Sequence, residues 1–297
     1  MKIAFIGDCQ GKVHYNRYKS MSKYISNIVF DFFTIKNPNL SKKCAKYDKV
    51  YYASYTMYNR NAVKHPYLYG SATSWKCITG VDHKKDMKIL PVFRSMSANN
   101  VLLATELQKI RPDIKYIPNG VDTSFFIYER KEIHDPLTIG WVGNYDRSEK
   151  NYPIVARLVK TCPEFTWSTV ITSKSTPVSK MLSREKMREF YYALDYLLVA
   201  SSYEGTPNPA LEAAACGIPL ITTRVGNMPE IINEGKTGFF VYPKKKSIRD
   251  CLDNILGVSN QYYIQMCRSI SETMIQWDWS IICKKFEDFF INDTFTN

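Results

Sequence analysis

Two spacings of apolar side chains alternate along the first 118 residues. Residues 2–8 (KIAFIGD) and 28–35 (IVFDFFTI) are β-branched and aromatic runs of strand length. Residues 13–26, between them, carry large side chains at helical spacing, so the segment predicts a strand, a helix and a strand in succession. Further strand-like runs occupy residues 49–55, 101–105 and 114–117.

The same alternation continues through the second half of the chain. Strand-like runs occupy residues 137–143, 165–172, 196–201, 219–226 and 238–243. Helical patterns occupy residues 152–162, 184–194, 209–217 and 277–290. Strands that alternate with helices favour parallel sheets covered by helices, so we expect an α/β protein with doubly wound sheets.

Chain length and charge both indicate two domains. A chain of 297 residues is long for one compact core, and Pro118, Asn119 and Gly120 interrupt the pattern near its middle. Residues 1–118 hold 20 lysines and arginines against seven acidic residues, whereas residues 119–297 hold 20 against 21. The predicted organisation is a basic N-terminal domain over 1–118, a second domain over 119–276 and a C-terminal helix over 277–297.

The uneven charge predicts an anionic partner for the first domain. Nucleic acid, a phospholipid surface and a phosphorylated glycan all fit, and so does an ordinary solvated surface without such a partner. No signal peptide or transmembrane segment is apparent, and the eight cysteines are scattered without a CxxC pair. We therefore expect a reduced, cytoplasmic protein whose cysteines bind no metal, peripheral at the inner membrane face or active in an infected host cell.

The segment with the clearest chemistry is residues 203–226 (YEGTPNPALEAAACGIPLITTRVG). It follows a strand-like run, opens with a turn rich in glycine and proline, and continues into a helix. The carboxyl end of a strand and the amino end of a helix present backbone N–H groups that bind phosphorylated ligands in α/β domains. Glu204 and Glu212 bracket this turn, and carboxylates suit sugar hydroxyls because each accepts several hydrogen bonds.

These residues resemble the Glu-x7-Glu family of retaining glycosyltransferases, also described as glycosyl transferases group 1 or family 4-like. The resemblance covers roughly residues 115–290, including PNGVD (118–122), similar to the family's interdomain link, and WDW (277–279), similar to its terminal helix that crosses back to the first domain. It implies a GT-B fold, in which two Rossmann-like domains face a cleft. Within the segment, the match rests on Glu204, Gly205, Leu211, Glu212, Ala213, Ala215, Cys216, Gly217, Ile218, Pro219, Gly226, Pro229, Glu230, Thr237 and Gly238.

The resemblance also implies roles for individual residues. Glu212 would bind the ribose of a nucleotide-sugar, Glu204 would bind the donor sugar, and Lys150 would neutralise the departing diphosphate. The family uses no divalent metal, so no cofactor is expected. An arginine usually stands at the position of Asn144, and Arg147 is the candidate replacement. The remaining donor-site candidates are Gly143, Gly205, Thr206, Pro207, Asn208 and Leu211.

Candidates in the first domain rest on weaker patterns. Gly11, in the turn after the first strand, would let the backbone approach the diphosphate, although a plain turn explains it equally well. His65 and His83, besides His14, are imidazoles available to an acceptor site, and a lone histidine is more often structural.

Two classes of function remain open on the sequence. The first is a retaining, metal-independent hexosyltransferase that moves a sugar from a UDP- or GDP-sugar to an anionic acceptor. An envelope glycan or lipid-linked acceptor is favoured, and hydroxymethylated bases of modified viral DNA are the alternative, because tyrosines and basic residues interleave over 13–26. The second is an inactive GT-B module that binds a polyanion.

Overall fold

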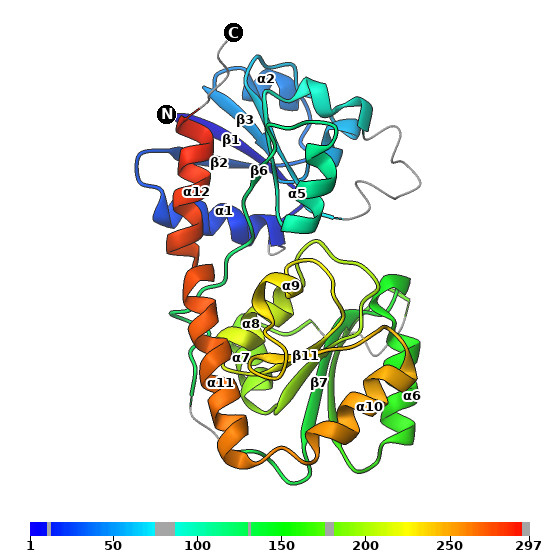
Figure 1. Ribbon diagram of the computed structural model, residues 1–297. Helices are drawn as coiled ribbons and strands as arrows, with labels where there is room; N and C mark the ends of the chain where they lie inside the picture. Colours follow the sequence, from blue (N-terminus) through cyan, green and yellow to red (C-terminus); the bar gives the residue numbers. More distant parts are fainter. Residues whose placement is uncertain (11–12, 75–86, 130–131, 176–180, 293–297) are drawn as a thin grey trace. The chain divides into compact units, whose positions relative to one another are not determined.

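The computed structural model describes residues 1–10, 13–74, 87–129, 132–175 and 181–292 (Figure 1). The chain divides into two compact units. The first unit comprises Met1–Asn119 with Trp279–Asn297, and the second comprises Gly120–Asp278. Gly11 and His83 lie outside the described residues.

The first unit is built on a parallel sheet with the strand order β2-β1-β3-β4-β5-β6. Its strands are β1 (Lys2–Gly7), β2 (Val29–Thr34), β3 (Lys49–Tyr52), β4 (Leu68–Ala72), β5 (Ser95–Ala98) and β6 (Lys115–Tyr116). Its helices are α1 (Val13–Tyr24), α2 (Leu40–Cys44), α5 (Val101–Gln108) and α12 (Trp279–Ile291), with short 3-10 turns at Tyr55–Asn59 and Leu90–Val92.

Two apolar layers cover this sheet. On one face α12, from the far end of the chain, packs beside α1 (Figure 1), and its Phe286 and Phe290 rings meet Tyr51 edge to face. On the other face, buried side chains of the strands, such as Tyr52, join Leu103 and Leu107 of α5. Burial of aromatic rings on both faces is the main stabilising contribution to such a layered unit.

The second unit has a five-stranded parallel sheet with the order β11-β10-β9-β7-β8. Its strands are β7 (Thr138–Asn144), β8 (Thr166–Thr172), β9 (Tyr196–Val199), β10 (Leu220–Thr222) and β11 (Gly238–Phe240). Its helices are α6 (Tyr152–Thr161), α7 (Arg184–Tyr192), α8 (Asn208–Ala215), α9 (Met228–Ile231), α10 (Lys245–Ile255) and α11 (Asn260–Met274), with 3-10 turns at Ser148–Lys150 and Ile275–Trp277.

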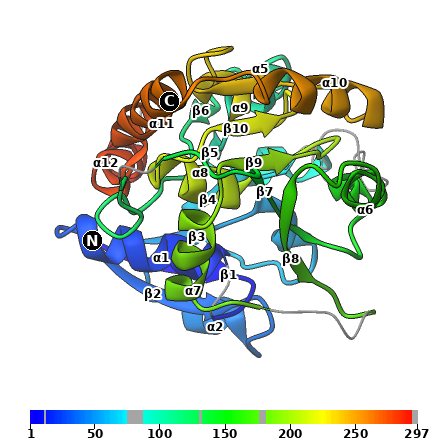
Figure 2. The same ribbon diagram turned by 90° about the horizontal axis from the view of Figure 1, so that it is seen from below.

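Helices cover both faces of the second sheet. The helices α6 and α10 lie side by side (Figures 1 and 2) and bury Leu158 and Leu252 in one cluster. The opposite cluster gathers Tyr191 of α7 and Leu211 of α8 with Met274 of α11. The carboxyl edge of the sheet is therefore left to the connecting loops, which is where an open α/β sheet binds its ligand.

One predicted strand is wrong. Residues 101–105 begin α5, because the side chain of Asn100 accepts a hydrogen bond from Leu103 N at 2.8 Å and caps the helix. The strand at this place is β5, just before the cap. The sequence patterns also missed β4, α2, α9, α10 and α11. Within the described part of the chain, no helix combines the length and the apolar character needed to cross a membrane.

Candidate functional site

The candidate site lies where the strand order of the second sheet reverses. The chain runs from β7 to β8 on one side and then returns to β9 on the other side of β7. Open α/β sheets bind ligands at such a switch point, beyond the carboxyl ends of the strands. The loops after β7 and β9 hold Lys150 and Glu204, and the second loop continues into α8 with Glu212.

Lys150 and Glu204 form a buried ion pair between these two loops. The ammonium group of Lys150 bonds Oε1 of Glu204, and the two side chains are only 12% and 5% exposed. The hydroxyl of Ser201 donates to the same carboxylate oxygen at 2.8 Å. Burial of a charge is costly unless the charge is paired and hydrogen-bonded, so loss of either partner would leave the other unfavourably buried.

A second ion pair lies beside the first. Arg147 donates from Nε to Oε1 of Glu149 at 2.8 Å, and its Nη2 lies 2.7 Å from the same oxygen. The carboxylate is buried, whereas the Arg147 side chain is 46% exposed. The Oδ1 atom of Asn144 accepts a hydrogen bond from Asp146 N at 2.8 Å, which closes a turn at the end of β7. Arg147 is thus the cation that this turn presents to solvent.

Close backbone packing shapes the loop between β9 and α8. Gly226 has a φ of +53°, and a Cβ added there would lie 2.6 Å from the carbonyl oxygen of Gly205. Gly143 is equally constrained, since its Cβ would lie 2.4 Å from the ring of Trp141. Thr206 donates from its hydroxyl to Oδ1 of Asn227 at 2.7 Å. Gly226 is therefore favoured by space and by conformation, and Gly143 by space alone.

The amino end of α8 offers fewer backbone donors than its sequence implies. Pro207 has no N–H group, and the N–H of Asn208 donates to the carbonyl of Thr206 at 3.0 Å. Leu211 N points to the carbonyl of Pro207 at 3.4 Å, and the Leu211 side chain is buried in the core.

Glu212 lies in the middle of α8, and one tyrosine is hydrogen-bonded to its carboxylate. The hydroxyl of Tyr191 donates to its Oε2 at 2.7 Å. Burial raises the pKa of Glu212 to about 7, although the Tyr191 hydrogen bond and the charge of Arg184 oppose the shift. A carboxylate with this pKa is desolvated and gains from any ligand hydroxyl that donates to it.

The two described histidines of the first unit, His14 and His65, have different surroundings. Nε2 of His65 lies 2.9 Å from the carbonyl oxygen of Tyr47, and Nδ1 accepts from Tyr67 N at 3.1 Å. Both ring nitrogens of His65 thus contact backbone atoms nearby. His14 instead lies at the start of α1 with Nδ1 3.2 Å from Oδ1 of Asp8. His14 was a candidate on the sequence, whereas Asp8, which directly follows β1 and lies six residues earlier, was not.

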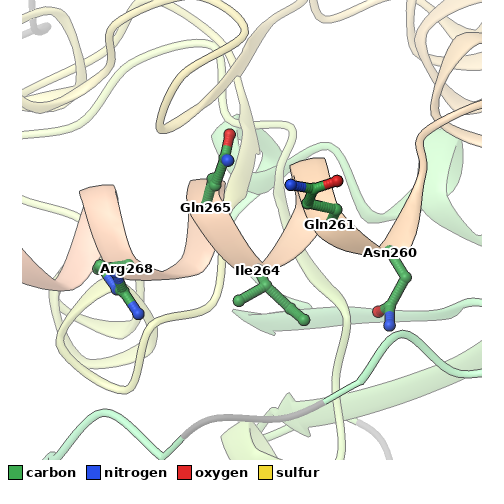
Figure 3. Close-up of a pocket in the computed structure, with 5 residues that line it drawn as sticks. All are labelled: Asn260, Gln261, Ile264, Gln265 and Arg268. Atoms are coloured by element: carbon green, nitrogen blue, oxygen red, sulfur yellow. The ribbon is translucent and has the colours of Figure 1, made fainter.

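Among the described residues, neither metal ligands nor the hollow along α11 adds a functional group to the candidate site. Among the described residues, no group of three or more His, Cys, Asp and Glu side chains is placed to hold a metal ion. A hollow of about 410 Å³ runs along α11, where Gln261 and Gln265 extend to one side of the helix and Ile264 to the other (Figure 3). It has no acidic side chain in its lining, which comprises Asn260, Gln261, Ile264, Gln265 and Arg268.

Comparison with known sequences identifies the second unit. Residues 136–258 match the family model of glycosyl transferases group 1. The D-inositol 3-phosphate glycosyltransferase of Mycolicibacterium smegmatis is 32% identical over 98 residues, which are 33% of this chain and 22% of that protein. The second unit is therefore similar to glycosyl transferases group 1 over residues 136–258, in agreement with the resemblance seen in the sequence.

A longer alignment joins both units to a eukaryotic relative. The phosphatidylinositol N-acetylglucosaminyltransferase GPI3 subunit of Saccharomyces cerevisiae is 23% identical over 228 residues, or 67% of this chain and 49% of that protein. The chain thus spans less than half the length of either curated relative.

Among solved structures, Anabaena Alr3699/HepE in complex with UDP-glucose gives a TM-score of 0.80. The two chains are 14% identical, and the alignment covers 98% of this chain and 100% of the other. At this identity the likeness shows the fold alone. It confirms the predicted GT-B class, with two Rossmann-like α/β domains.

Proposed function

We propose that this protein is a glycosyltransferase that takes a sugar from a nucleotide-sugar bound at the switch point of the second unit. The observation that carries the proposal is the buried Lys150–Glu204 pair, with Glu212 on the helix that follows. A cation and two carboxylates in one loop cluster match the two parts of such a donor, an anionic diphosphate and hydroxyl-rich sugars. The group 1 match over residues 136–258 supports the same function.

Each side chain has a distinct role in this proposal. Glu212 accepts hydrogen bonds from the ribose hydroxyls, and Glu204 accepts them from the donor sugar. Lys150 exchanges its bond to Glu204 for one to the diphosphate, and Arg147, oriented by Glu149, contacts the same phosphates from the solvent side. The backbone around Gly143, Asn144, Gly205, Thr206, Pro207, Asn208 and Leu211 lines the site.

Charge stabilisation is the main chemical task of the site. The bond between the anomeric carbon and the phosphate oxygen breaks as the acceptor hydroxyl oxygen attacks, and the bonding electrons leave with the nucleoside diphosphate. Lys150 and Arg147 stabilise this developing negative charge without a divalent metal. Attack on the face that the diphosphate leaves, with the departing phosphate oxygen taking the hydroxyl proton, retains the anomeric configuration.

The identities of the donor and of the acceptor are supported by the names of similar proteins and by the charge of the first 118 residues. HepE, which shares the fold, was solved with UDP-glucose, so UDP-glucose is the first donor to test. The names of the two relatives specify an inositol phosphate and a phosphatidylinositol acceptor. Together with the excess of basic residues in the first 118 positions, they support an anionic, membrane-associated or lipid-linked acceptor.

Modified viral DNA receives less support as the acceptor. Of the tyrosines in α1, Tyr15 and Tyr18 pack against Phe32 with ring centroids 5.0 and 5.3 Å apart, and Tyr18 also meets Phe5. Rings that pack on one another present less area for stacking on bases. Retention on heparin with steep salt dependence, but not on anionic liposomes, would favour DNA instead.

A screen of the purified protein against nucleotide-sugars tests the proposal. We expect one donor to raise the melting temperature and to release its nucleoside diphosphate slowly in water, with EDTA present throughout. Binding that requires a divalent metal would overturn the metal-independent mechanism. If no donor is bound or hydrolysed, a polyanion-binding module without transferase activity becomes the better description.

A further inference from the structure

Asn151 follows Lys150 directly and has an unusual backbone conformation. Its φ of 54° and ψ of 35° lie in the left-handed region. Within the described ranges, and apart from the glycines, a positive φ occurs otherwise only at Asn39. Residues with a side chain adopt this conformation at a cost, although asparagine tolerates it better than most. The turn that carries Lys150 therefore favours glycine or asparagine at its end.

The side chain of Asn151 has a different partner from that of most asparagines at the start of a helix. Such a side chain commonly accepts a hydrogen bond from a backbone N–H of the first helical turn, but Asn151 makes no such bond among the described residues of α6. Its Nδ2 atom instead donates to the carbonyl oxygen of Ala200 and to Oγ of Ser202, both at 2.8 Å. The amide of Asn151 therefore joins the loop after β7 to the loop after β9.

The two partners of this amide flank Ser201, which orients a carboxylate of the candidate site. The hydroxyl of Ser201 donates to Oε1 of Glu204 at 2.8 Å, and the ammonium group of Lys150 bonds the same oxygen. The contacts thus form a closed ring that runs from Lys150 through Glu204 and Ser201 to Asn151, the residue next to Lys150. Such a ring restricts Lys150 both at its charged end and at its backbone.

Backbone hydrogen bonds support the same connection. Ser202 N donates to the carbonyl oxygen of Glu149, the residue before Lys150, at 2.8 Å. Asn151 N donates to the carbonyl oxygen of Ser148 at 3.1 Å and closes the 3-10 turn that contains Lys150. The loop that carries Lys150 is therefore bonded to the next loop on both sides of this lysine.

We propose that Asn151 is a positioning residue, which holds the ammonium group of Lys150 where the diphosphate of the donor binds. The proposal rests on the transferase function above, in which Lys150 leaves Glu204 for the phosphates. When that ion pair opens, the charged end of the lysine is released, and the amide of Asn151 still keeps its backbone beside the loop after β9. A cation that is already in place stabilises the diphosphate without the cost of ordering the loop.

The variant Asn151→Gly separates the amide from the backbone conformation. Glycine adopts a φ of 54° without strain, so the variant keeps the turn and loses only the two side-chain bonds. The probe is UDP, or the nucleoside diphosphate of whichever donor the screen finds. In calorimetric titration we expect about tenfold weaker binding than in the wild type, because Lys150 must be ordered on binding. The melting temperature should fall by a few degrees at most.

Asn39 supplies a matched control in the first unit. It begins α2 with a φ of 55° and a ψ of 35°, and among the described residues its side chain likewise caps no helix. Because Asn39 is exposed, Asn39→Gly makes the same chemical change at the same conformation, far along the chain from Lys150, and should leave UDP binding unchanged. An equal loss of affinity in Asn39→Gly would mean that glycine acts by loosening the protein, and the proposal would be overturned.

A double-variant comparison tests whether Asn151 acts through Lys150. Lys150→Met combined with Glu204→Gln supplies a background without the cation, and titration into the millimolar range of UDP keeps its weaker binding measurable. Addition of Asn151→Gly to this background should weaken binding by less than about twofold, since the side chain that Asn151 positions is gone. A further loss of about tenfold would show that Asn151 shapes the site in another way, and the proposed role would be wrong.

The remaining outcomes separate this role from the function on which it depends. If the wild type binds UDP and Asn151→Gly binds it as tightly, the positioning role of Asn151 alone is overturned. If the wild type binds no nucleoside diphosphate at all, the transferase function is overturned and the role of Asn151 with it.

Discussion

The two units share one architecture and differ in the chemistry at their switch points. In the second unit the loops carry charge pairs, Lys150 with Glu204 and Arg147 with Glu149, around a turn that contains Gly205. In the first unit the corresponding place holds the weaker Asp8–His14 pair and a helix rich in aromatic residues. The family match covers residues 136–258 only. The second unit thus follows a pattern shared with other sequences, whereas the family match does not extend to the first unit.

The largest expected effect is the loss of Lys150. In Lys150→Ala, we expect sugar transfer to fall at least ~1,000-fold, because the departing diphosphate loses its cation. The variant should also be less stable by roughly 3 kcal/mol, since Glu204 is left as a buried, unpaired carboxylate. Assays of nucleoside diphosphate release and urea unfolding measure the two effects.

Two further variants sharpen this test. Lys150→Met combined with Glu204→Gln should recover stability without recovering transfer, and Lys160→Ala, at an exposed position of α6, should leave both unchanged. Transfer that survives in Lys150→Ala would show that the charge pair is only structural. The contrast between the units would then lose its main support.

The next effect concerns a buried cation of the first unit. Arg17 is 2% exposed and donates to Tyr51, Asn119 and the carbonyl of Ala53 rather than to a carboxylate. Arg17→Ala should lower the free energy of unfolding by about 3 kcal/mol, because three acceptors of a charged donor lose their partner. Urea unfolding measures the loss, with exposed Lys19→Ala on the same helix as the control. A change below ~1 kcal/mol would contradict this structural role.

A smaller, pH-dependent effect is expected at Glu212. Its pKa is raised from 4.5 to about 7 in the folded protein, so the fold carries a cost of ionisation that is absent below pH 4.5 and complete above pH 7. Glu212→Gln removes this cost. Relative to the wild type, the variant should gain about 2 kcal/mol between pH 4.5 and pH 8.

Urea unfolding at the two pH values checks this expectation. Glu272→Gln on the exposed side of α11 is the control substitution. An equal stability difference at both pH values would mean that Glu212 is not desolvated in the fold.

The smallest effect is expected at Arg147. Its guanidinium is half exposed and already bound to Glu149, so its contact with a phosphate replaces interactions with water. Arg147→Ala should weaken UDP binding by about tenfold at most, as calorimetric titration would show, while exposed Arg157→Ala should not. If both variants bind UDP like the wild type, Arg147 only orders the turn after β7.

The sequence predicted the strands of the second unit better than those of the first. Its strands, such as β7 and β8, are rich in β-branched and aromatic residues, and the predicted runs overlap them. In the first unit, β4 (LYGSA) and β5 (SMSA) consist largely of small or weakly strand-forming residues. They are strands because neighbouring strands bury them. At Gly70, for example, the Phe93 ring lies 2.9 Å from where a Cβ would be.

For the candidate site residues, too, local sequence patterns predict only part of what the structure shows. Glu204 and Glu212 belong to one continuous motif and were named as candidates from it. The ion pair between Lys150 and Glu204 joins positions 54 residues apart, and only the sheet order brings them together. The Asp8–His14 pair needs the start of α1 to pack against the end of β1, which no local pattern specifies.

The binding of a nucleotide-sugar to Glu212→Ala tests the central claim most directly. We expect calorimetric titration with the donor found in the screen to give clear binding for the wild type and none for the variant, with the fold of the variant intact. Unchanged donor affinity in Glu212→Ala would contradict the assignment of the donor site to the switch point of the second unit.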